Sequence, residues 1–204
     1  MKGIAVLGAT GTIGVNTHDV IRRHPQKYRI IALTANSQVD RLLKQCMEFE
    51  PEYAVMVSEQ AAIQLEQKLK QNGLTTKVLQ GAASLETVAQ LANVDIVMAA
   101  IVGAAGLKSS LAAAKAGKRI LLANKESLVM SGKLFIDQVQ EHGAELLPID
   151  SEHNAIFQCM PVNYSDGLDK VGINKILLTG SGGPFRELAL EQFANVTPEQ
   201  AIAH

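Results

Sequence analysis

Short apolar runs alternate with longer amphipathic stretches along the first 149 residues of the chain. The apolar runs are continuous rather than alternating, which is the pattern of strands covered on both faces in a parallel sheet. They predict strands at residues 3–8, 29–34, 53–57, 77–79, 94–98, 119–122 and 145–149. The amphipathic stretches predict helices at residues 12–23, 38–47, 59–72, 84–91, 105–116 and 126–142. Three glycines fall where a helix should end, as expected of C-terminal caps: Gly73, Gly117 and Gly143.

This alternation of strands and helices predicts a fold of the α/β class. Repeated βαβ units with right-handed crossovers give a doubly wound, mostly parallel, Rossmann-like sheet. The pattern changes near Pro148, after which an apolar strand is predicted at residues 173–179. We therefore expect two domains, at residues 1–149 and 150–204, the second being the start of an α+β domain.

Composition narrows the classes of partner. Lys and Arg total 19 against 20 for Asp and Glu, and aromatic residues are only 4%, so a nucleic-acid partner is not expected. The longest apolar run, residues 96–107, is too short to cross a bilayer, so no membrane partner is expected. Cys46 and Cys159 form no Cys-x-x-Cys pair and are expected as free thiols in the cytoplasm.

A glycine-rich turn, Gly8-Ala-Thr-Gly-Thr-Ile-Gly14, joins the first predicted strand to the first predicted helix. Glycine permits a tight turn and lets backbone amides approach a pyrophosphate, and the helix N-terminus adds free N–H groups and a partial positive charge. The G-x-x-G-x-x-G spacing is a variant of the dinucleotide-binding motif. Such a turn can also be a simple tight connection, but its place in a βαβ unit predicts a dinucleotide site.

The residues after the second predicted strand favour NADP over NAD. An NAD site usually has a carboxylate there, on the ribose 2′-hydroxyl. No acidic residue lies between Asp19 and Asp40, so nothing repels a 2′-phosphate. Arg41 is a candidate partner for that phosphate, and equally a candidate for a solvent-facing helix residue.

Two carboxylates, Asp150 and Glu152, follow the predicted strand that ends at residue 149. On an extended chain they would point the same way, and their oxygens suit Mg²⁺ or Mn²⁺. The alternative is that Ser151 caps a helix and Glu152 complements its dipole. From spacing alone the cap is the stronger reading, because two carboxylates do not fill a metal shell.

Two further positions have both a chemical and an ordinary interpretation. Lys125, at the end of the sixth predicted strand, could neutralise a negatively charged substrate or lie on a solvated helix start. The stretch Gly180-Ser-Gly-Gly183 offers Ser181 and backbone amides to a phosphate, or forms an ordinary turn before Pro184.

Five stretches together resemble the 1-deoxy-D-xylulose 5-phosphate reductoisomerase family, in order along nearly all of the chain. They are Gly8-Ala-Thr-Gly-Thr-Ile-Gly14, Met98-Ala-Ala-Ile-Val-Gly-Ala-Ala-Gly-Leu107, Leu122-Ala-Asn-Lys-Glu-Ser127, Asp150-Ser-Glu-His-Asn-Ala-Ile-Phe-Gln158 and Leu178-Thr-Gly-Ser-Gly-Gly-Pro-Phe-Arg186. The resemblance implies a cytoplasmic, homodimeric enzyme of non-mevalonate isoprenoid biosynthesis. Its cofactors would be NADPH and Mg²⁺ or manganese, and its substrate a small phosphorylated sugar.

The resemblance also implies roles for individual residues. Those implied to contact the cofactor are Thr10, Gly11, Thr12, Ile13, Asn36, Gln38, Asn124 and Glu126. Those implied to contact the substrate are Lys125, Ser151, Glu152, Ser181 and His204. Asp150 and Glu152 would be two of three carboxylate metal ligands and, with Lys125, the catalytic residues. The resemblance makes a metal role of the pair the preferred reading over the helix cap.

The implied reaction converts 1-deoxy-D-xylulose 5-phosphate to 2-C-methyl-D-erythritol 4-phosphate. The carbon skeleton would rearrange by retro-aldol cleavage and re-aldolisation, and NADPH would then reduce the resulting branched aldehyde. The metal would polarise a carbonyl as a Lewis acid, and a lid would exclude water.

The chain departs from the family in two ways. Members often carry Gly-Lys-Asn after the second strand, and here the stretch is Asn36-Ser-Gln38, so a lysine for the 2′-phosphate is missing. The chain also stops at His204, before the rest of the lid, a phosphate site, the third metal carboxylate and a C-terminal helical domain. We therefore expect residues 1–204 alone to bind NADPH but to be inactive.

Two other interpretations stay open. A semialdehyde-dehydrogenase-like oxidoreductase also opens with Gly-Ala-Thr-Gly, but it needs a thiolate nucleophile. Neither Cys46 nor Cys159 has a candidate base nearby in the sequence. The other interpretation is a nucleotide-binding chain without catalysis.

Overall fold

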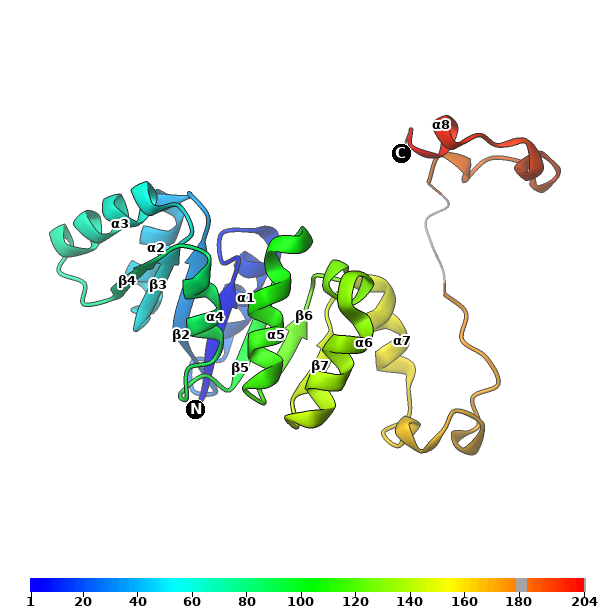
Figure 1. Ribbon diagram of the computed structural model, residues 1–204, viewed down its shortest axis with the longest axis horizontal. Helices are drawn as coiled ribbons and strands as arrows, with labels where there is room; N and C mark the ends of the chain where they lie inside the picture. The colour runs from blue at the N-terminus through cyan, green and yellow to red at the C-terminus, as the bar shows by residue number, and fades with distance from the viewer. Residues whose placement is uncertain (179–182, 204) are drawn as a thin grey trace. The chain divides into compact units, whose positions relative to one another are not determined.

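The computed structural model describes residues 1–178 and 183–203 (Figure 1). The chain divides into two compact units, Met1–Asp150 and Ser151–His204. The division therefore falls beside the boundary expected at residue 149.

The first unit is built on a seven-stranded sheet in which every neighbouring pair of strands is parallel. Its strands are β1 (Lys2–Leu7), β2 (Tyr28–Ala35), β3 (Tyr53–Met56), β4 (Lys77–Gln80), β5 (Ile96–Ala99), β6 (Arg119–Leu122) and β7 (Glu145–Pro148). Their order is β4-β3-β2-β1-β5-β6-β7, so the chain starts in the middle of the sheet, builds one half and then crosses over to build the other. The predicted doubly wound α/β fold is confirmed.

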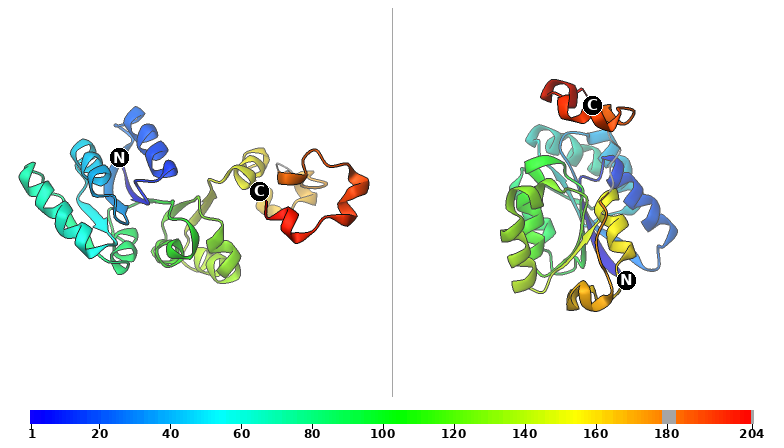
Figure 2. Two further views of the ribbon diagram at one scale, coloured as in Figure 1. Left: turned by 90° about the horizontal axis from the view of Figure 1, so that it is seen from above. Right: turned by 90° about the vertical axis from the view of Figure 1, so that its right-hand side faces the viewer.

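Helices cover both faces of this sheet (Figure 2). They are α1 (Thr12–Arg23), α2 (Val39–Phe49), α3 (Glu59–Gln71), α4 (Ala83–Ala89), α5 (Leu107–Lys115) and α6 (Glu126–Glu141). In β1, Ile4 and Val6 pack in one core with α1, α2 and α3, whereas Ala5 and Leu7 pack in the other with α4, α5 and α6. Because successive strand residues point to opposite faces, covering both faces requires the continuous apolar runs seen in the sequence.

The three predicted C-terminal glycines are confirmed. Gly73, Gly117 and Gly143 follow α3, α5 and α6 with φ of 70°, 66° and 63°. This left-handed conformation turns the chain back over the helix end, so that the N–H of Leu74 donates to the carbonyl of Leu69 at 3.0 Å. Each helix therefore ends where the sequence predicts, and the chain returns to the sheet.

The second unit is helical in its described part. It contains α7 (Ser151–Cys159), α8 (Pro198–Ala201) and short 3₁₀ helices at Tyr164–Asp166, Asp169–Val171, Gly183–Phe185 and Leu190–Asn195. The predicted strand is wrong for residues 173–178, and residue 179 lies outside the described residues. No described segment pairs with residues 173–178, and a strand needs a neighbour for its backbone hydrogen bonds. Across the described residues of both units, no helix has the length and apolar character to cross a bilayer.

Candidate functional site

A cleft of about 730 Å³ opens where β1, β2, β3 and β5 end. Its lining residues are Gly8, Thr10, Gly11, Thr34, Ala35, Asn36, Val57, Ala82, Leu85, Ala100, Ile101, Val102, Ala104, Ala105 and Lys108. Strand β1 lies between β2 and β5, at the point where the strand order reverses. Open α/β sheets bind their ligands in the crevice at this point, and the volume suits a small organic ligand.

The glycine-rich turn forms one wall of the cleft, and β2 holds its first residues in place. The N–H of Gly8 donates to Thr34 Oγ1 at 3.0 Å, and the N–H of Ala9 donates to the carbonyl of Thr34 at 2.8 Å. Gly8 has a φ of 84°, which residues with a side chain rarely adopt. The turn is therefore fixed to the sheet before any ligand binds.

The three glycines of the turn have different surroundings. A Cβ on Gly14 would lie 2.5 Å from the carbonyl oxygen of Gly8, and one on Gly8 would lie 2.8 Å from that of Ala100. These two glycines are needed for packing within the protein. A Cβ on Gly11 would meet only the carbonyl oxygen of Gly8, at an ordinary 3.5 Å. Gly11 is exposed and lines the cleft, so the space beside it is left for a ligand.

Helix α1 begins at this turn with its first amides available. Gly11 is its N-cap and offers no side-chain hydrogen bond, and the first turn contains no acidic residue. The first amides of a helix have no intrahelical acceptor and carry part of the positive end of the helix dipole. The turn therefore fits the pyrophosphate of a dinucleotide.

The other residues expected at the cofactor lie in different places. Thr10 and Asn36 line the cleft, whereas Gln38, which precedes α2, does not. Thr12 is exposed in the first turn of α1, and Ile13 packs against the core on the α1 face. The motifs did not identify Val57, Ala82, Leu85 or Lys108, which lie outside the quoted stretches and also line the cleft.

Asn124, expected at the cofactor, supports the wall of the cleft. Its side chain is 3% exposed, and its Nδ2 donates to the carbonyls of Ile101 at 2.5 Å and Gly103 at 2.8 Å. These carbonyls belong to the loop after β5, which contains the short 3₁₀ helix Gly103–Gly106. The loop approaches so closely that a Cβ on Gly106 would lie 2.7 Å from Asn124 Nδ2. Asn124 therefore fixes the loop that lines the cleft, and it is not among the lining residues itself.

Lys125 and Glu126 lie at the start of α6, and both are exposed. The next residue, Ser127, is fully buried, and its hydroxyl has no hydrogen-bond acceptor or donor among the described residues. Helix α6 is interrupted at Ser131, whose φ of −144° is not helical. The first turn of α6 is thus a separate short piece that presents Lys125 and Glu126 to solvent.

The structure corrects the expected geometry of the carboxylate pair. Ser151 and Glu152 begin α7, so Glu152 lies in a helical first turn rather than on an extended chain. Because the chain turns helical directly after Asp150, the two carboxylates do not lie on one extended strand, and the expectation that they share a strand face is wrong. The described residues contain no group of three or more His, Cys, Asp or Glu side chains placed to hold a metal ion. Asp150 and Glu152 remain candidate oxygen ligands, but they do not complete a shell.

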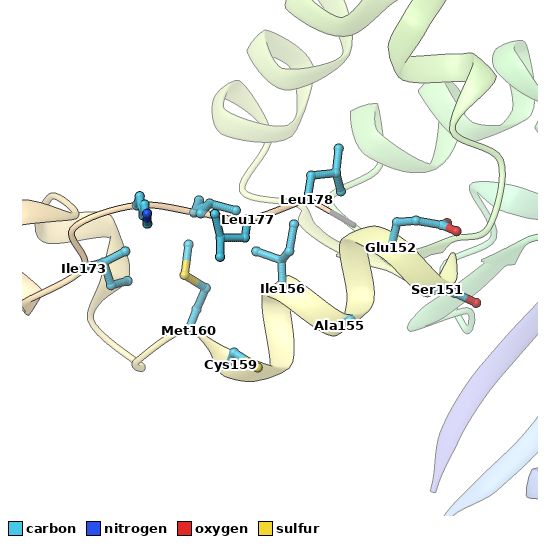
Figure 3. A pocket seen from close by; sticks show the side chains of 11 residues that line it. Ser151, Glu152, Ala155, Ile156, Cys159, Met160, Ile173, Leu177 and Leu178 are labelled. Atoms are coloured by element: carbon cyan, nitrogen blue, oxygen red, sulfur yellow. The ribbon is translucent and has the colours of Figure 1, made fainter. Parts of the chain in front are cut away.

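A second cavity, of about 560 Å³, lies within the second unit (Figure 3). Ser151, Glu152 and the apolar side of α7 form one wall, and residues 173 and 175–178 form the other. Leu178 is the last described residue before position 183, so Ser181 lies outside the described residues, as does His204. The structure therefore brings together Ser151, Glu152 and residues 173 and 175–178.

The two cysteines differ in their surroundings. Cys46 is a buried core residue of α2, and burial raises the pKa of its thiol to about 12. It is therefore not a reactive thiolate. Cys159 is exposed and lines the second cavity. Both are free thiols, as expected.

Comparison with protein families gives two matches. Residues 4–132 match the family described as 1-deoxy-D-xylulose 5-phosphate reductoisomerase, and residues 146–204 match the C-terminal domain described under the same name. The reductoisomerase of Dechloromonas aromatica is 57% identical over 204 residues, which are 100% of this chain and 51% of that protein. That of Pseudomonas putida KT2440 is 60% identical over 201 residues, 98% of this chain and 50% of that protein. The chain thus spans about half the length of these curated relatives.

Solved structures agree with these matches. A crystal structure of DOX-P reductoisomerase in complex with NADPH, fosmidomycin and magnesium is 50% identical, with a TM-score of 0.87 over 99% of this chain and 50% of that chain. The Zymomonas mobilis enzyme in complex with NADPH is 45% identical, with a TM-score of 0.85 over 98% of this chain and 51% of that chain.

Proposed function

The chain belongs to the 1-deoxy-D-xylulose 5-phosphate reductoisomerase family, and we propose that it supplies the NADPH-binding domain and the first part of the catalytic domain of such an enzyme. The observation that carries this proposal is the cleft at the end of β1, where the space beside Gly11 adjoins the uncapped start of α1. Solved relatives in complex with NADPH support the choice of ligand.

In this proposal the pyrophosphate of NADPH lies on the turn. The first amides of α1 and the hydroxyls of Thr10 and Thr12 donate to its oxygens. The adenosine half extends past Asn36 at the end of β2, and Gln38 lies just beyond it. The nicotinamide half extends toward the start of α6, where Glu126 contacts it and Asn124 holds the intervening loop in place.

The reaction we propose is the isomerisation and reduction of 1-deoxy-D-xylulose 5-phosphate to 2-C-methyl-D-erythritol 4-phosphate. Bound NADPH would supply the hydride, and a divalent cation, Mg²⁺ or Mn²⁺, would supply Lewis-acid polarisation of the carbonyl. Asp150 and Glu152 are proposed to hold the cation, together with ligands outside the described residues. Lys125, Ser151, Ser181 and His204 are proposed to bind the sugar phosphate. The homodimeric state and the isoprenoid pathway are proposed from the family resemblance, and the cytoplasmic location is proposed from the resemblance and from the two free cysteines.

The described residues also favour a distinction between binding and catalysis. They contain the cleft proposed for the dinucleotide but only two candidate carboxylates, which do not fill a metal shell. We therefore infer that residues 1–204 alone bind NADPH and turn over little or no substrate. Substrate-dependent loss of NADPH absorbance in a purified sample of this chain would contradict that inference.

The cofactor proposal is tested by direct binding. NADPH and NADH are titrated separately into the 204-residue chain, and nicotinamide fluorescence is followed. We expect saturable binding of NADPH and weaker binding of NADH. Equal or tighter binding of NADH would contradict the NADP assignment, and no binding of either would contradict a cofactor cleft.

A further inference from the structure

Lys108 is the only charged residue among the described residues that line the cofactor cleft. It lies in the first turn of α5, directly after the loop that Asn124 holds. No motif identified it, because it follows the glycine-rich segment after β5 rather than the one after β1.

The position of Lys108 is electrostatically unfavourable within the protein itself. A cation in the first turn of a helix faces the positive end of the helix dipole. The first turn of α5 has no acidic residue, and its N-cap, Gly106, makes no side-chain cap hydrogen bond. Lys108 makes no hydrogen bond or ion pair with any of the described residues. Folding alone therefore provides no reason for a positive charge here, whereas an anion in the cleft would.

The position of the cleft identifies which anion. The end of β2 is where dinucleotide sites contact the ribose 2′-oxygen, and Asn36 at that position lines the same cavity as Lys108. The residues expected near the nicotinamide, at the start of α6, do not line this cavity. The cavity is therefore the adenosine half of the site.

The residues directly after β2 offer no cation to the 2′-phosphate. Asn36, Ser37 and Gln38 are all uncharged, and Arg41 does not line the cleft. The pyrophosphate has the amides of α1, but a 2′-phosphate adds a dianion that those amides do not reach at the end of β2. Lys108, which reaches the cleft from α5, is the cation available to it.

We propose that Lys108 binds the 2′-phosphate of NADPH and thereby sets the preference of the cleft for NADPH over NADH. This inference rests on the proposed function, because it requires the cleft to hold a dinucleotide. The ammonium group of Lys108 takes the place of a cation at the end of β2. The contact is a charge-assisted hydrogen bond, so the preference for NADPH weakens as ionic strength rises.

The test measures dissociation constants of NADPH and NADH for the 204-residue chain and three variants. Lys108→Gln removes the charge, and Lys108→Arg keeps it. Lys115→Gln is the matched control, because it removes an exposed lysine from the last turn of the same helix. Thermal unfolding of each variant checks that the fold is retained. Titrations with 2′,5′-ADP and 5′-AMP isolate the 2′-phosphate from the nicotinamide.

In Lys108→Gln we expect the dissociation constant of NADPH and of 2′,5′-ADP to rise about tenfold, with those of NADH and 5′-AMP changed less than about twofold. Lys108→Arg should restore most of the preference, and Lys115→Gln should leave all four constants unchanged. Equal losses for NADPH and NADH, or no loss for either, would overturn the role of Lys108. If the unmodified chain binds neither dinucleotide, the proposed function fails instead.

Discussion

A methyl group added to either of two glycines in one turn should affect different properties: stability at Gly14 and NADPH binding at Gly11. In Gly14→Ala, the new Cβ would lie 2.5 Å and 2.6 Å from the carbonyl oxygens of Gly8 and Ala9. An ordinary carbon–oxygen contact is about 3.3 Å, so α1 must move away from the turn by about 0.8 Å. Overpacking of this kind costs about 1–3 kcal/mol. For a chain of this size the thermal midpoint should fall by about 2–12 °C.

In Gly11→Ala, the added Cβ has room within the protein. Gly11 has φ of −80° and ψ of 171°, which alanine adopts without strain, and its nearest neighbour would be at 3.5 Å. The free energy of unfolding should therefore change by less than about 0.5 kcal/mol. The methyl group would instead occupy the space proposed for the pyrophosphate. We expect the dissociation constant of NADPH to rise at least about tenfold.

The assay combines thermal unfolding, followed by circular dichroism, with fluorescence titration of NADPH. Gly132→Ala is the control, because a Cβ at this helical glycine would meet nothing within 4 Å. It should leave NADPH binding unchanged. The reasoning is refuted if Gly11→Ala lowers the thermal midpoint as much as Gly14→Ala, or if it binds NADPH as tightly as the unmodified chain.

Three further predictions concern stability, loop position and the metal. Burial lowers the pKa of His18 from 6.5 to about 4, so between these values the unfolded chain binds a proton that the folded chain excludes. In urea titrations, the free energy of unfolding of the unmodified chain should fall by about 3 kcal/mol as the pH falls from 6.5 to 4. The control His24→Gln should show the same decrease, and His18→Leu should not show it. Asn124→Ala removes the donor to two carbonyls of the loop after β5. It should lower the free energy of unfolding in urea by about 1–3 kcal/mol and weaken NADPH binding. Unchanged values would show that the loop keeps its position without Asn124. Asp150→Asn should weaken Mn²⁺ binding at least about tenfold by electron paramagnetic resonance, with Asp169→Asn as control, and equal binding by both variants would favour the helix-cap interpretation.

Most elements of the first unit could be predicted from the sequence, because their signals are local. The observed helices and strands of that unit begin and end within about two residues of the predicted limits. Continuous apolar runs marked strands covered on both faces, and glycines marked helix ends. The residue pattern of the second unit was less informative. An apolar run predicted a strand at residues 173–179, but strand formation in residues 173–178 depends on a neighbour that the described residues do not provide.

The candidate site was predictable to the extent that its chemistry sits in continuous motifs. The glycine-rich turn indicated a dinucleotide, and the five stretches that resemble the family indicated the family. The geometry around Asp150 and Glu152 was not predictable from their spacing, because it depends on whether the chain there is extended or helical, and Glu152 lies in the first turn of α7.

The sequence by itself therefore determined the doubly wound sheet, the place of the glycine-rich turn and the family, since each depends on residues close together in the chain. Only the tertiary structure decided the separate tasks of Gly11 and Gly14, the support that Asn124 gives to the loop after β5, and the entry of Lys108 into the cleft. The roles of the two glycines depend on the folded shape of the turn itself, and the other two features depend on contact or proximity between segments distant in sequence. The periodicity of apolar residues shows which face of an element is buried but not which groups meet there.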